Sequence, residues 1–325
     1  MNPAESGEGP RVSELRDRAR QLGFLACGVA SLEPSRRGSF LDQWLKAGYA
    51  GTMRYLHRQA GRRKDPRLIV AGARTAVVVL ENYLPGAADS RPGEVKIARY
   101  ARGTDYHRAL RARLDQLAEW LRSRGAALTR GFTDSGPVPE RELAEQAGLG
   151  WIGKNTMLIR PQSGSFCFIG TIFTDLALEP SPGLDRDWCG SCTRCLDACP
   201  TGALLAPRVL DGTRCISYLT IESRAPIPDS LGDRLEGWAF GCDICNEVCP
   251  WNIRFAEPGS RPEYQDREAI ATGDPDCFER MNQEEFAARF EDTPLERPGL
   301  SGMRRNWRAA FRSLSTRSDP GTVRP

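Results

Sequence analysis

The chain has 325 residues, and its 45 Lys and Arg residues against 42 Asp and Glu residues leave a net charge of only +3. So small an excess does not by itself indicate a nucleic-acid-binding protein, although the length suffices for two or three domains. No apolar stretch approaches the ~20 residues of a membrane-spanning helix, and the polar N-terminus carries neither an apolar nor a twin-arginine signal. We therefore expect a cytoplasmic protein that is not bound to a membrane.

The first 180 residues alternate between helical and strand-like apolar patterns. Apolar residues spaced by three or four predict helices at 12–22, 106–124 and 140–147. Continuous apolar runs predict strands at 24–29, 75–80, 127–132 and 166–173. Because strands that alternate with helices are typical of an α/β layer, we predict an α+β or α/β fold with a mixed sheet and helices on both of its faces.

The rest of the chain divides into two smaller units. Residues 178–187 contain prolines and glycine and predict a linker, after which a cysteine-rich module extends to residue 255. The remainder contains one helical pattern, at 282–290, and a polar tail from Ser313 that we expect to be disordered. We therefore predict an α/β domain at 1–180, a ferredoxin-like domain at 181–255 and a short helical segment at 256–325.

The most informative feature of the chain is a run of four closely spaced cysteines. Cys189, Cys192, Cys195 and Cys199 are followed by Pro200. This C-x2-C-x2-C-x3-C-P spacing is that of bacterial ferredoxins, in which three cysteines bind one [4Fe–4S] cluster and the fourth binds another. The motif therefore predicts a second cluster, and its thiolate ligands indicate a reducing compartment.

A second cysteine run also ends in a proline, but the residue at position 239, where a fourth cysteine is expected, is alanine; Cys215 is available as the substitute. The pairing rule of two-cluster ferredoxins then gives one set of ligands as Cys189, Cys192, Cys195 and Cys249, and the other as Cys199, Cys215, Cys242 and Cys245. Zinc sites also combine CxxC pairs, but a compact run that ends in Cys-Pro favours iron–sulfur clusters. Cys27 and Cys167 lie in apolar runs and are predicted to be core residues.

The region before the cysteine module is larger than an electron-carrying ferredoxin needs. Clusters transfer single electrons, and their coupling to bond chemistry usually requires a cofactor that holds two. The sequence has no GxGxxG after a strand, which argues against a nicotinamide site, whereas a flavin stays open. Two arginine-rich runs, at 62–64 and 304–308, can bind phosphates but more often form solvated faces.

Several motifs, in order along the chain, resemble those of the epoxyqueuosine reductases, which are cobalamin-dependent iron–sulfur enzymes of tRNA modification. The resemblance extends over residues 10–310 and rests on 102–107 (RGTDYH), 134–141 (DSGPVPER), 150–155 (GWIGKN), 189–200, 215–220 (CISYLT) and 241–250. It implies a cobalamin in the α/β domain beside one cluster, and it relates the chain to reductive dehalogenases. His107 lacks the D-x-H-x-x-G context of cobalt-ligating histidines, because residue 110 is leucine. We therefore expect base-off cobalamin without a histidine ligand.

The resemblance also implies a reaction, the reduction of epoxyqueuosine to queuosine at the wobble position of tRNA. Electrons from an external low-potential donor pass through two [4Fe–4S] clusters, and cob(I)alamin attacks the epoxide while an acid protonates the departing oxygen. Asp134 is the predicted acid, because it follows a predicted strand and because burial can keep its carboxyl protonated. Without the resemblance, an Asx-turn residue is the better interpretation of Asp134.

Further residues receive roles by the same resemblance. It places Arg63, Tyr100, Asp134, Lys154, Ser217 and Asp243 around the cofactor, and Arg141 and Glu222 near the substrate. For each of the weaker assignments, a surface ion pair or a loop hydrogen bond is an equal alternative. The implied partner is a tRNA anticodon loop that carries epoxyqueuosine, and an unpaired loop lets a base swing into a pocket at low cost. We expect the protein to act as a monomer.

Three other functions stay open at this point. A cobalamin-dependent reductive dehalogenase shares the cofactors, but the missing twin-arginine signal and the motif at 134–141 disfavour it. A non-catalytic electron-transfer protein predicts that no corrinoid is bound. A nucleic-acid-binding protein with structural clusters predicts an activity that does not depend on reductant.

Overall fold

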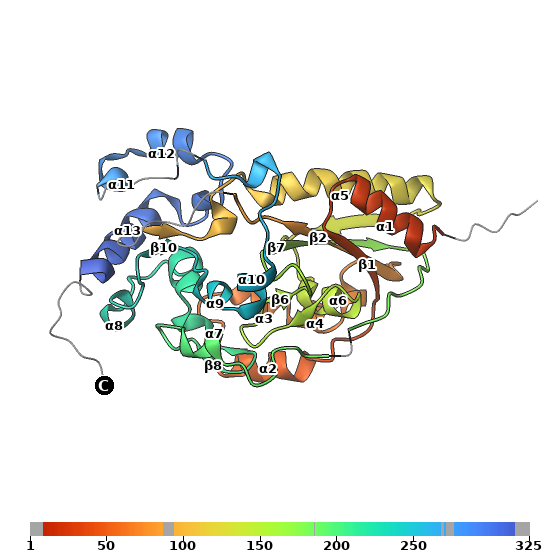
Figure 1. The fold of residues 1–325 in the computed structure, drawn as a ribbon, viewed down its shortest axis with the longest axis horizontal. Helices are drawn as coiled ribbons and strands as arrows, with labels where there is room; N and C mark the ends of the chain where they lie inside the picture. Colours follow the sequence, from red (N-terminus) through yellow and green to blue (C-terminus); the bar gives the residue numbers. More distant parts are fainter. Residues whose placement is uncertain (1–8, 87–93, 185, 268–269, 271–275, 316–325) are drawn as a thin grey trace, which may run out of the picture.

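A four-stranded antiparallel sheet organises the first half of the chain (Figure 1). The computed structural model describes residues 9–86, 94–184, 186–267, 270 and 276–315. The strands lie in the order β1 (Ala26–Ser31), β2 (Thr75–Asn82), β7 (Cys167–Thr174) and β4 (Thr129–Phe132). Ala26 pairs with Leu80 and Thr75 pairs with Thr174, which fixes the register on both sides of β2. The predicted strands are confirmed, with ends shifted by up to two residues.

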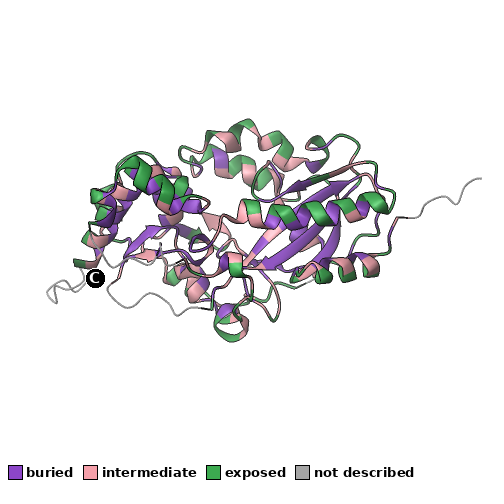
Figure 2. Ribbon diagram, turned by 90° about the horizontal axis from the view of Figure 1, so that it is seen from above, coloured by how far each residue is buried: buried purple, intermediate pink, exposed green. Residues whose placement is uncertain are grey.

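Helices cover both faces of this sheet, as the sequence predicts (Figure 2). On one face, α1 (Val12–Gln21) and α5 (Tyr106–Ser123) bury Leu15 and Leu114 against Val77. On the other face, α6 (Glu140–Gln146) buries Leu143 against Val78. Neighbouring residues of β2 therefore belong to different apolar clusters, because successive side chains of a strand point to opposite faces.

The connection between β1 and β2 forms a layer of short helices at one end of the sheet. Its elements are α2 (Gly38–Lys46), α3 (Arg54–Arg58), α4 (Ala60–Lys64) and the 3₁₀ turn η1 (Pro66–Leu68). Asp65 caps η1 by accepting the backbone N–H of Arg67 at 3.1 Å, and Pro66 supplies the fixed backbone angle that favours the first position of a helix. This layer brings Arg63 to the site described below.

The cysteine module consists of short elements joined by turns. They are α7 (Arg194–Asp197), β8 (Leu204–Ala206), β9 (Val209–Leu210), η3 (Gly212–Arg214), the π-helical turn η4 (Tyr218–Glu222), α8 (Asp229–Gly232), β10 (Trp238–Phe240), α9 (Ile244–Glu247) and α10 (Pro250–Phe255). The strand β10 pairs in parallel with β3 (Lys96–Ile97), so the parallel pairing expected of a mixed sheet lies outside the four-stranded sheet. This pairing ties the module to a segment far away in the sequence.

The C-terminal segment contains a long helix that the sequence analysis missed. Besides α11 (Cys277–Arg280) and α12 (Gln283–Phe290), α13 spans Gly299–Ser315. The polar tail was therefore placed too early, because Ser313 is buried in α13; residues 316–325 lie outside the described residues. The run at 304–308 also differs from a solvated face, since the Arg304 guanidinium donates to the carbonyl of Met281 at 2.6 Å.

Three separate stretches of sequence share one apolar core at this end of the molecule, far from α1 (Figure 1). Ile97 and Phe240 pack there with Phe278, Phe290 and Trp307. The remaining short elements are η2 (Arg99–Ala101), β5 (Trp151–Ile152), β6 (Leu158–Ile159), η5 (Pro262–Tyr264) and η6 (Pro294–Glu296). Among the described residues, none of the helices has the length and apolar character needed to cross a membrane.

Candidate active site and cluster-binding cysteines

Asp134 lies in the loop between β4 and α6, with a backbone φ of 48°. A non-glycine residue is rarely found in this left-handed region, although aspartate tolerates it better than most residues do. Two contacts from neighbouring elements fix the residue. The Tyr106 hydroxyl on α5 donates to Asp134 Oδ2 at 2.9 Å, and the Asp134 backbone N–H donates to Glu140 Oε1 at 2.8 Å. The loop is therefore held from both sides of its turn.

Two adjoining cavities meet at Asp134. One, of about 250 Å³, is lined on one side by Tyr100, Tyr106 and Phe168. The other, of about 360 Å³, extends toward Arg63 on α4. Asp134, Glu140 and Arg141 line both cavities, so the loop and the start of α6 form the wall between them.

The ionisable groups around the two cavities differ in exposure. Asp134 is exposed, so the burial that the sequence analysis expected for it is wrong. Burial first, and the neighbouring charge of Asp134 second, instead raise the pKa of half-buried Glu140 to about 8. Burial first, and the Asp134 carboxylate second, also raise the pKa of Tyr106, so its hydroxyl keeps its proton and acts as a donor.

A second charged group faces Asp134 across the site. Arg297 forms an ion pair with Glu222 at 2.6 Å. Burial opposes the charge of Arg297, but Glu222, Tyr55 and Asp134 together raise its pKa. Burial lowers the pKa of Arg63, whose guanidinium donates to the Gly136 carbonyl at 3.4 Å. The site therefore combines carboxyl and guanidinium groups from four separate stretches of the chain.

Four of the predicted cluster ligands line a single cavity of about 250 Å³. They are Cys189, Cys192, Cys195 and Cys249. Burial first, and then the Cys189, Cys249 and Cys192 sulfurs, raise the pKa of Cys195 to about 11. A thiol with so high a pKa loses its proton only when a metal centre binds the sulfur in place of the proton.

Lys154 and a group of tryptophans surround this first set of cysteines. The Lys154 ammonium donates to the carbonyls of Gly190 and Cys192 at 2.6 and 2.9 Å. Trp151 Nε1 donates to Cys189 Sγ at 3.5 Å, and the Trp151 ring contacts the ring of Trp251 at a centroid distance of 4.9 Å. The structure thus places Lys154 at the cysteine cavity rather than at the cavities around Asp134.

The second set of cysteines is half-buried in the module. Burial, and the nearby Cys199 sulfur, raise the pKa of Cys215, although N–H groups of Tyr218 and Ser217 hydrogen-bond to it. Burial and then the sulfurs of Cys245 and Cys215 raise the pKa of Cys242. Cys245 interacts in turn with Cys199 and with Cys195 of the first set. The two sets are therefore separate but adjacent, as the pairing rule predicts, and Ser217 belongs to the second set.

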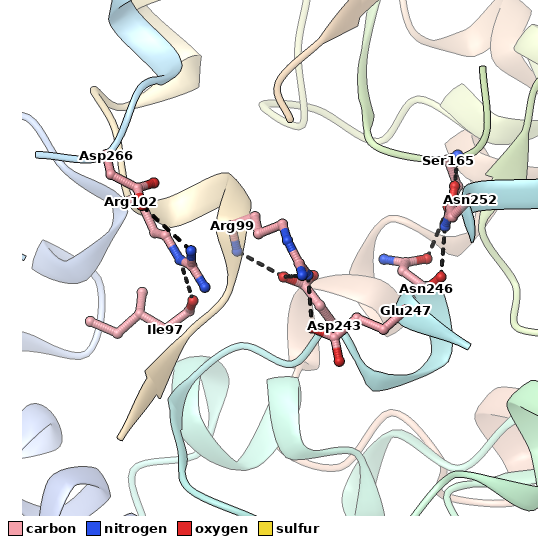
Figure 3. A network of polar contacts seen from close by, with 9 residues as sticks. All are labelled: Ile97, Arg99, Arg102, Ser165, Asp243, Asn246, Glu247, Asn252 and Asp266. Atoms are coloured by element: carbon pink, nitrogen blue, oxygen red, sulfur yellow. Dashed lines mark hydrogen bonds and ion pairs between the residues drawn. The ribbon is translucent and has the colours of Figure 1, made fainter. Parts of the chain in front are cut away.

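A polar network joins the module to the rest of the protein, and Figure 3 shows its two halves. Asp243, between two cysteines of the second set, accepts the Arg99 backbone N–H at 2.8 Å and the guanidinium at 3.3 Å. Asn246 Oδ1 accepts the Ser165 hydroxyl at 3.0 Å in the other half. Burial raises the pKa of Asp243, and the Arg99 contacts oppose it only in part. Asp243 is 2% exposed and does not line the cavities around Asp134.

The structure brings together only some of the predicted cofactor and substrate residues. Arg63, Tyr100, Asp134 and Arg141 line the two cavities, and Glu222 reaches this region through Arg297, whereas Lys154, Ser217 and Asp243 lie with the cysteines. Cys27 is buried as predicted, but Cys167 lines the smaller cavity. The sequence analysis missed Tyr106, Glu140, Arg297 and Tyr55, of which only the first two stand in motifs that it had quoted.

The cavities around Asp134 have features that suit a corrinoid. A corrin ring offers broad apolar faces, and its amide side chains need hydrogen-bond partners. Tyr106 and Phe168 supply aromatic lining to the smaller cavity, with their rings stacked on each other at a centroid distance of 4.3 Å. Arg63 Nε and Thr133 Oγ1 are buried polar atoms that lack a partner within the described part of the chain. Because buried polar groups are normally satisfied, these atoms fit the amides of such a ligand.

The fold and the site define a class of protein: an iron–sulfur oxidoreductase in which a double-cluster module adjoins a cavity that carries carboxyl groups. A family model described as a 4Fe-4S double cluster binding domain matches residues 188–252, and one described as epoxyqueuosine reductase QueG matches residues 63–135. The epoxyqueuosine reductase of Pseudomonas aeruginosa is 41% identical over 303 residues, which cover 91% of this chain and 83% of that protein.

Solved structures give the same result. A crystal structure of epoxyqueuosine reductase with an epoxyqueuosine-modified tRNA-Tyr stem loop has a TM-score of 0.82 and 30% identity, covering 94% of this chain and 82% of that one. The structure of the Bacillus subtilis enzyme, with its catalytic aspartate loop swung out of the active site, has a TM-score of 0.83 and 29% identity. The match again covers 94% of this chain and 82% of that one. The chain therefore belongs to the epoxyqueuosine reductase family.

Proposed function

We propose that this protein reduces epoxyqueuosine to queuosine at the wobble position of tRNA, with Asp134 as the general acid. The observation that carries the proposal is the placement of Asp134. Its carboxyl is oriented by Tyr106 at the junction of two cavities, and the cluster-binding module adjoins this region through β3 and the Arg99 network. A carboxyl at this position can deliver a proton to a substrate that receives electrons from the module.

Cobalamin is the cofactor that best fits the cavities around Asp134. Bound and reduced to cob(I)alamin, it supplies a nucleophilic metal centre and two electrons. Arg63, Thr133 and Tyr100 would hold its periphery, since the first two offer unpaired polar atoms and the third lines the cavity. His107 does not line either of the cavities around Asp134. This supports a base-off cofactor without a histidine ligand.

The protein's own groups manage the proton and the substrate. The net reaction removes the epoxide oxygen as water and forms a carbon–carbon double bond, which consumes two electrons and two protons. Asp134 gives its proton to the departing oxygen. Exposed Arg141, and the Glu222–Arg297 pair on the far side, are placed to bind the sugar-like ring and the nucleotide that carries it.

The eight cysteines would hold two [4Fe–4S] clusters that feed the cavity from an external low-potential donor. The second set adjoins Ser217 and Asp243, on the side of the Arg99 network, and the first set lies beside Trp188, which is 37% exposed. Electrons then enter at the first set and leave through the second. In this arrangement Lys154, Ser217 and Asp243 orient the cluster loops.

The proposed partner is the anticodon loop of an epoxyqueuosine-containing tRNA. A single-stranded loop can present its wobble base to a cavity without breaking base pairs. The related enzyme solved with a modified tRNA stem loop supports this choice. We propose that the protein acts as a cytoplasmic monomer.

The test is an anaerobic assay with epoxyqueuosine-containing tRNA, reconstituted clusters, added cobalamin and a strong reductant, read by mass spectrometry of the nucleosides. The expected result is loss of one oxygen from the modified base, only when cobalamin is present. Turnover without cobalamin would contradict the cofactor assignment. No conversion by protein with both clusters and bound cobalamin would contradict the substrate assignment.

A further inference from the structure

We propose that Glu140 is the resting place of the proton that Asp134 delivers, so that the two carboxyls act as one proton-sharing pair. The inference rests on the proposed function of the site and deepens it by giving Asp134 a source of protons. Three features carry it: the contact between the two residues, the surroundings of Glu140 and the proton demand of the reaction.

The contact places both carboxyls in the same cavities. Glu140 is the first residue of α6, and it reaches back six residues to accept the Asp134 backbone N–H at 2.8 Å through Oε1. Glu140 Oε2 has no hydrogen-bond partner among the residues that the structure describes. Both residues line both cavities, and the charge of Asp134 acts on Glu140, so the two carboxyls are close enough to interact.

The surroundings of Glu140 raise its pKa above that of an ordinary surface carboxyl and so favour its protonated form. Burial raises its pKa to about 8, and the charge of Asp134 acts in the same direction. Arg141 and Arg63 oppose this shift without cancelling it, while the Tyr106 hydroxyl faces the pair as a neutral donor. The nearby charged groups Arg37 and Glu142 are occupied, by Glu145 and by Ser35 respectively. Glu140 therefore keeps a proton at neutral pH while exposed Asp134 faces the substrate.

The reaction needs such a store of protons. Removal of the epoxide oxygen as water takes up two protons, and one carboxyl carries only one at a time. In the proposed sequence, Glu140 passes its proton to the Asp134 carboxylate, and Asp134 protonates the oxygen as the first carbon–oxygen bond breaks. Solvent reloads Glu140, and the same relay then delivers the second proton to the departing hydroxyl.

The decisive variant is Glu140→Gln. Its amide oxygen can still accept the hydrogen bond from the Asp134 backbone N–H, but the amide has no acidic proton to transfer. We expect single-turnover rates near wild type at pH 6, where solvent supplies protons, and rates lower by at least about 10-fold at pH 8. The alkaline limb of the pH profile therefore moves to lower pH. Glu119→Gln removes a carboxyl from the exposed surface of α5 and serves as the control, with an unchanged profile.

A second readout does not depend on turnover. Difference infrared spectroscopy of the reconstituted protein should show a protonated carboxyl at pH 7 that disappears as the pH passes about 8 in the wild type, and that is missing in Glu140→Gln. The same band in the variant, or superimposable pH profiles of the variant and an active wild type, would overturn the role of Glu140. A wild type that converts no substrate at any pH would instead contradict the proposed function.

Discussion

The sheet region and the cysteine module are stabilised in different ways. β2 and β7 have eight residues each and α5 has 18, and between them Val77, Leu114 and Ile172 are fully buried. The helices and strands of the module have two to six residues, and the apolar cluster next to its first cysteine set contains only Trp151, Ile159 and Cys249 as buried members. The sheet region therefore depends on apolar burial, whereas the loop of the first cysteine set depends on hydrogen bonds and on bonds to iron. The later part of the module buries Leu219, Leu235 and Trp238 in an apolar cluster of its own.

The active site lies where these two kinds of structure meet. Tyr106 belongs to the long helix of the sheet region, and Asp134 belongs to a loop at the end of one of its strands. Arg99 and Ser165 then connect this region to Asp243 and Asn246 of the module. The sheet region thus orients Asp134, the proposed acid, and the module is proposed to supply the electrons, so damage to either should leave the other measurable.

The largest effect should follow from removing the iron. Anaerobic chelation is expected to abolish turnover and to make backbone amides at 189–199 exchange freely, because this loop packs on few buried apolar residues once its metal is lost. Amides of β2 and β7 should keep their protection, which hydrogen-exchange mass spectrometry can follow peptide by peptide. Equal loss of protection in both regions would show that the sheet also depends on the clusters.

Asp134→Asn should have the next largest effect. The amide can accept from Tyr106 but has no acidic proton, so turnover is expected to fall by at least about 100-fold, the typical contribution of a general acid. Iron content should match the wild type because Asp134 does not line the cysteine cavity, and cobalamin absorbance should match because the amide keeps the size of the carboxyl. Single-turnover kinetics on epoxyqueuosine-containing tRNA measures the loss, and turnover within a few-fold of wild type would remove Asp134 as the acid.

Leu114→Ala tests the stability of the sheet region alone. Leu114 is fully buried in the cluster beneath α5, so its truncation should lower the free energy of unfolding by about 2–5 kcal/mol. Denaturant unfolding followed by circular dichroism gives the value, and iron content per chain should be unchanged in folded protein. Leu205→Ala, at a residue that is 43% exposed in β8, is the matched control and should cost far less. Equal costs at the two positions would contradict the assignment of the core.

The sequence predicted the parts of the fold that depend on local pattern. β2 is an uninterrupted apolar run, and α5 repeats apolar residues every three or four positions, so both were placed to within two residues of their ends. The two cysteine sets followed from spacing, and the structure groups them in the same way. α13 was missed because arginines interrupt its apolar stripe. In the structure these arginines bind backbone carbonyls, as Arg305 does with Leu219 at 2.9 Å.

The active site was harder to predict because its contacts are distant in the sequence. Tyr106 and Asp134 are separated by 28 positions, and Arg297 meets Glu222 only after α12 and η6 have folded back across the module. No local pattern marks such partners. The predicted burial of Asp134 also failed, since the residue lies exposed in its loop with a left-handed backbone, and the half-buried carboxyl of the pair is Glu140.

Tyr106→Phe is the smallest and most specific test of how the sheet region orients the acid. The change removes one hydrogen bond to the Asp134 carboxyl and keeps the ring that stacks on Phe168. A hydrogen bond to a charged group contributes about 1.5–3 kcal/mol, so turnover should fall by roughly 10-fold or more while the apparent affinity for tRNA is unchanged. The loss should be smaller than that of Asp134→Asn, because the proton donor is still present.

Tyr83→Phe is the control for this variant. Tyr83 lines the same cavity, and its ring packs on the ring of Phe168 at a centroid distance of 4.5 Å. Its hydroxyl makes no hydrogen bond within the described part of the chain. Single-turnover rates near wild type for Tyr83→Phe, with a clear loss for Tyr106→Phe, assign the effect to orientation of Asp134. Equal rates for the two variants would mean that α5 does not orient the acid, and that the loop and Glu140 alone fix its position.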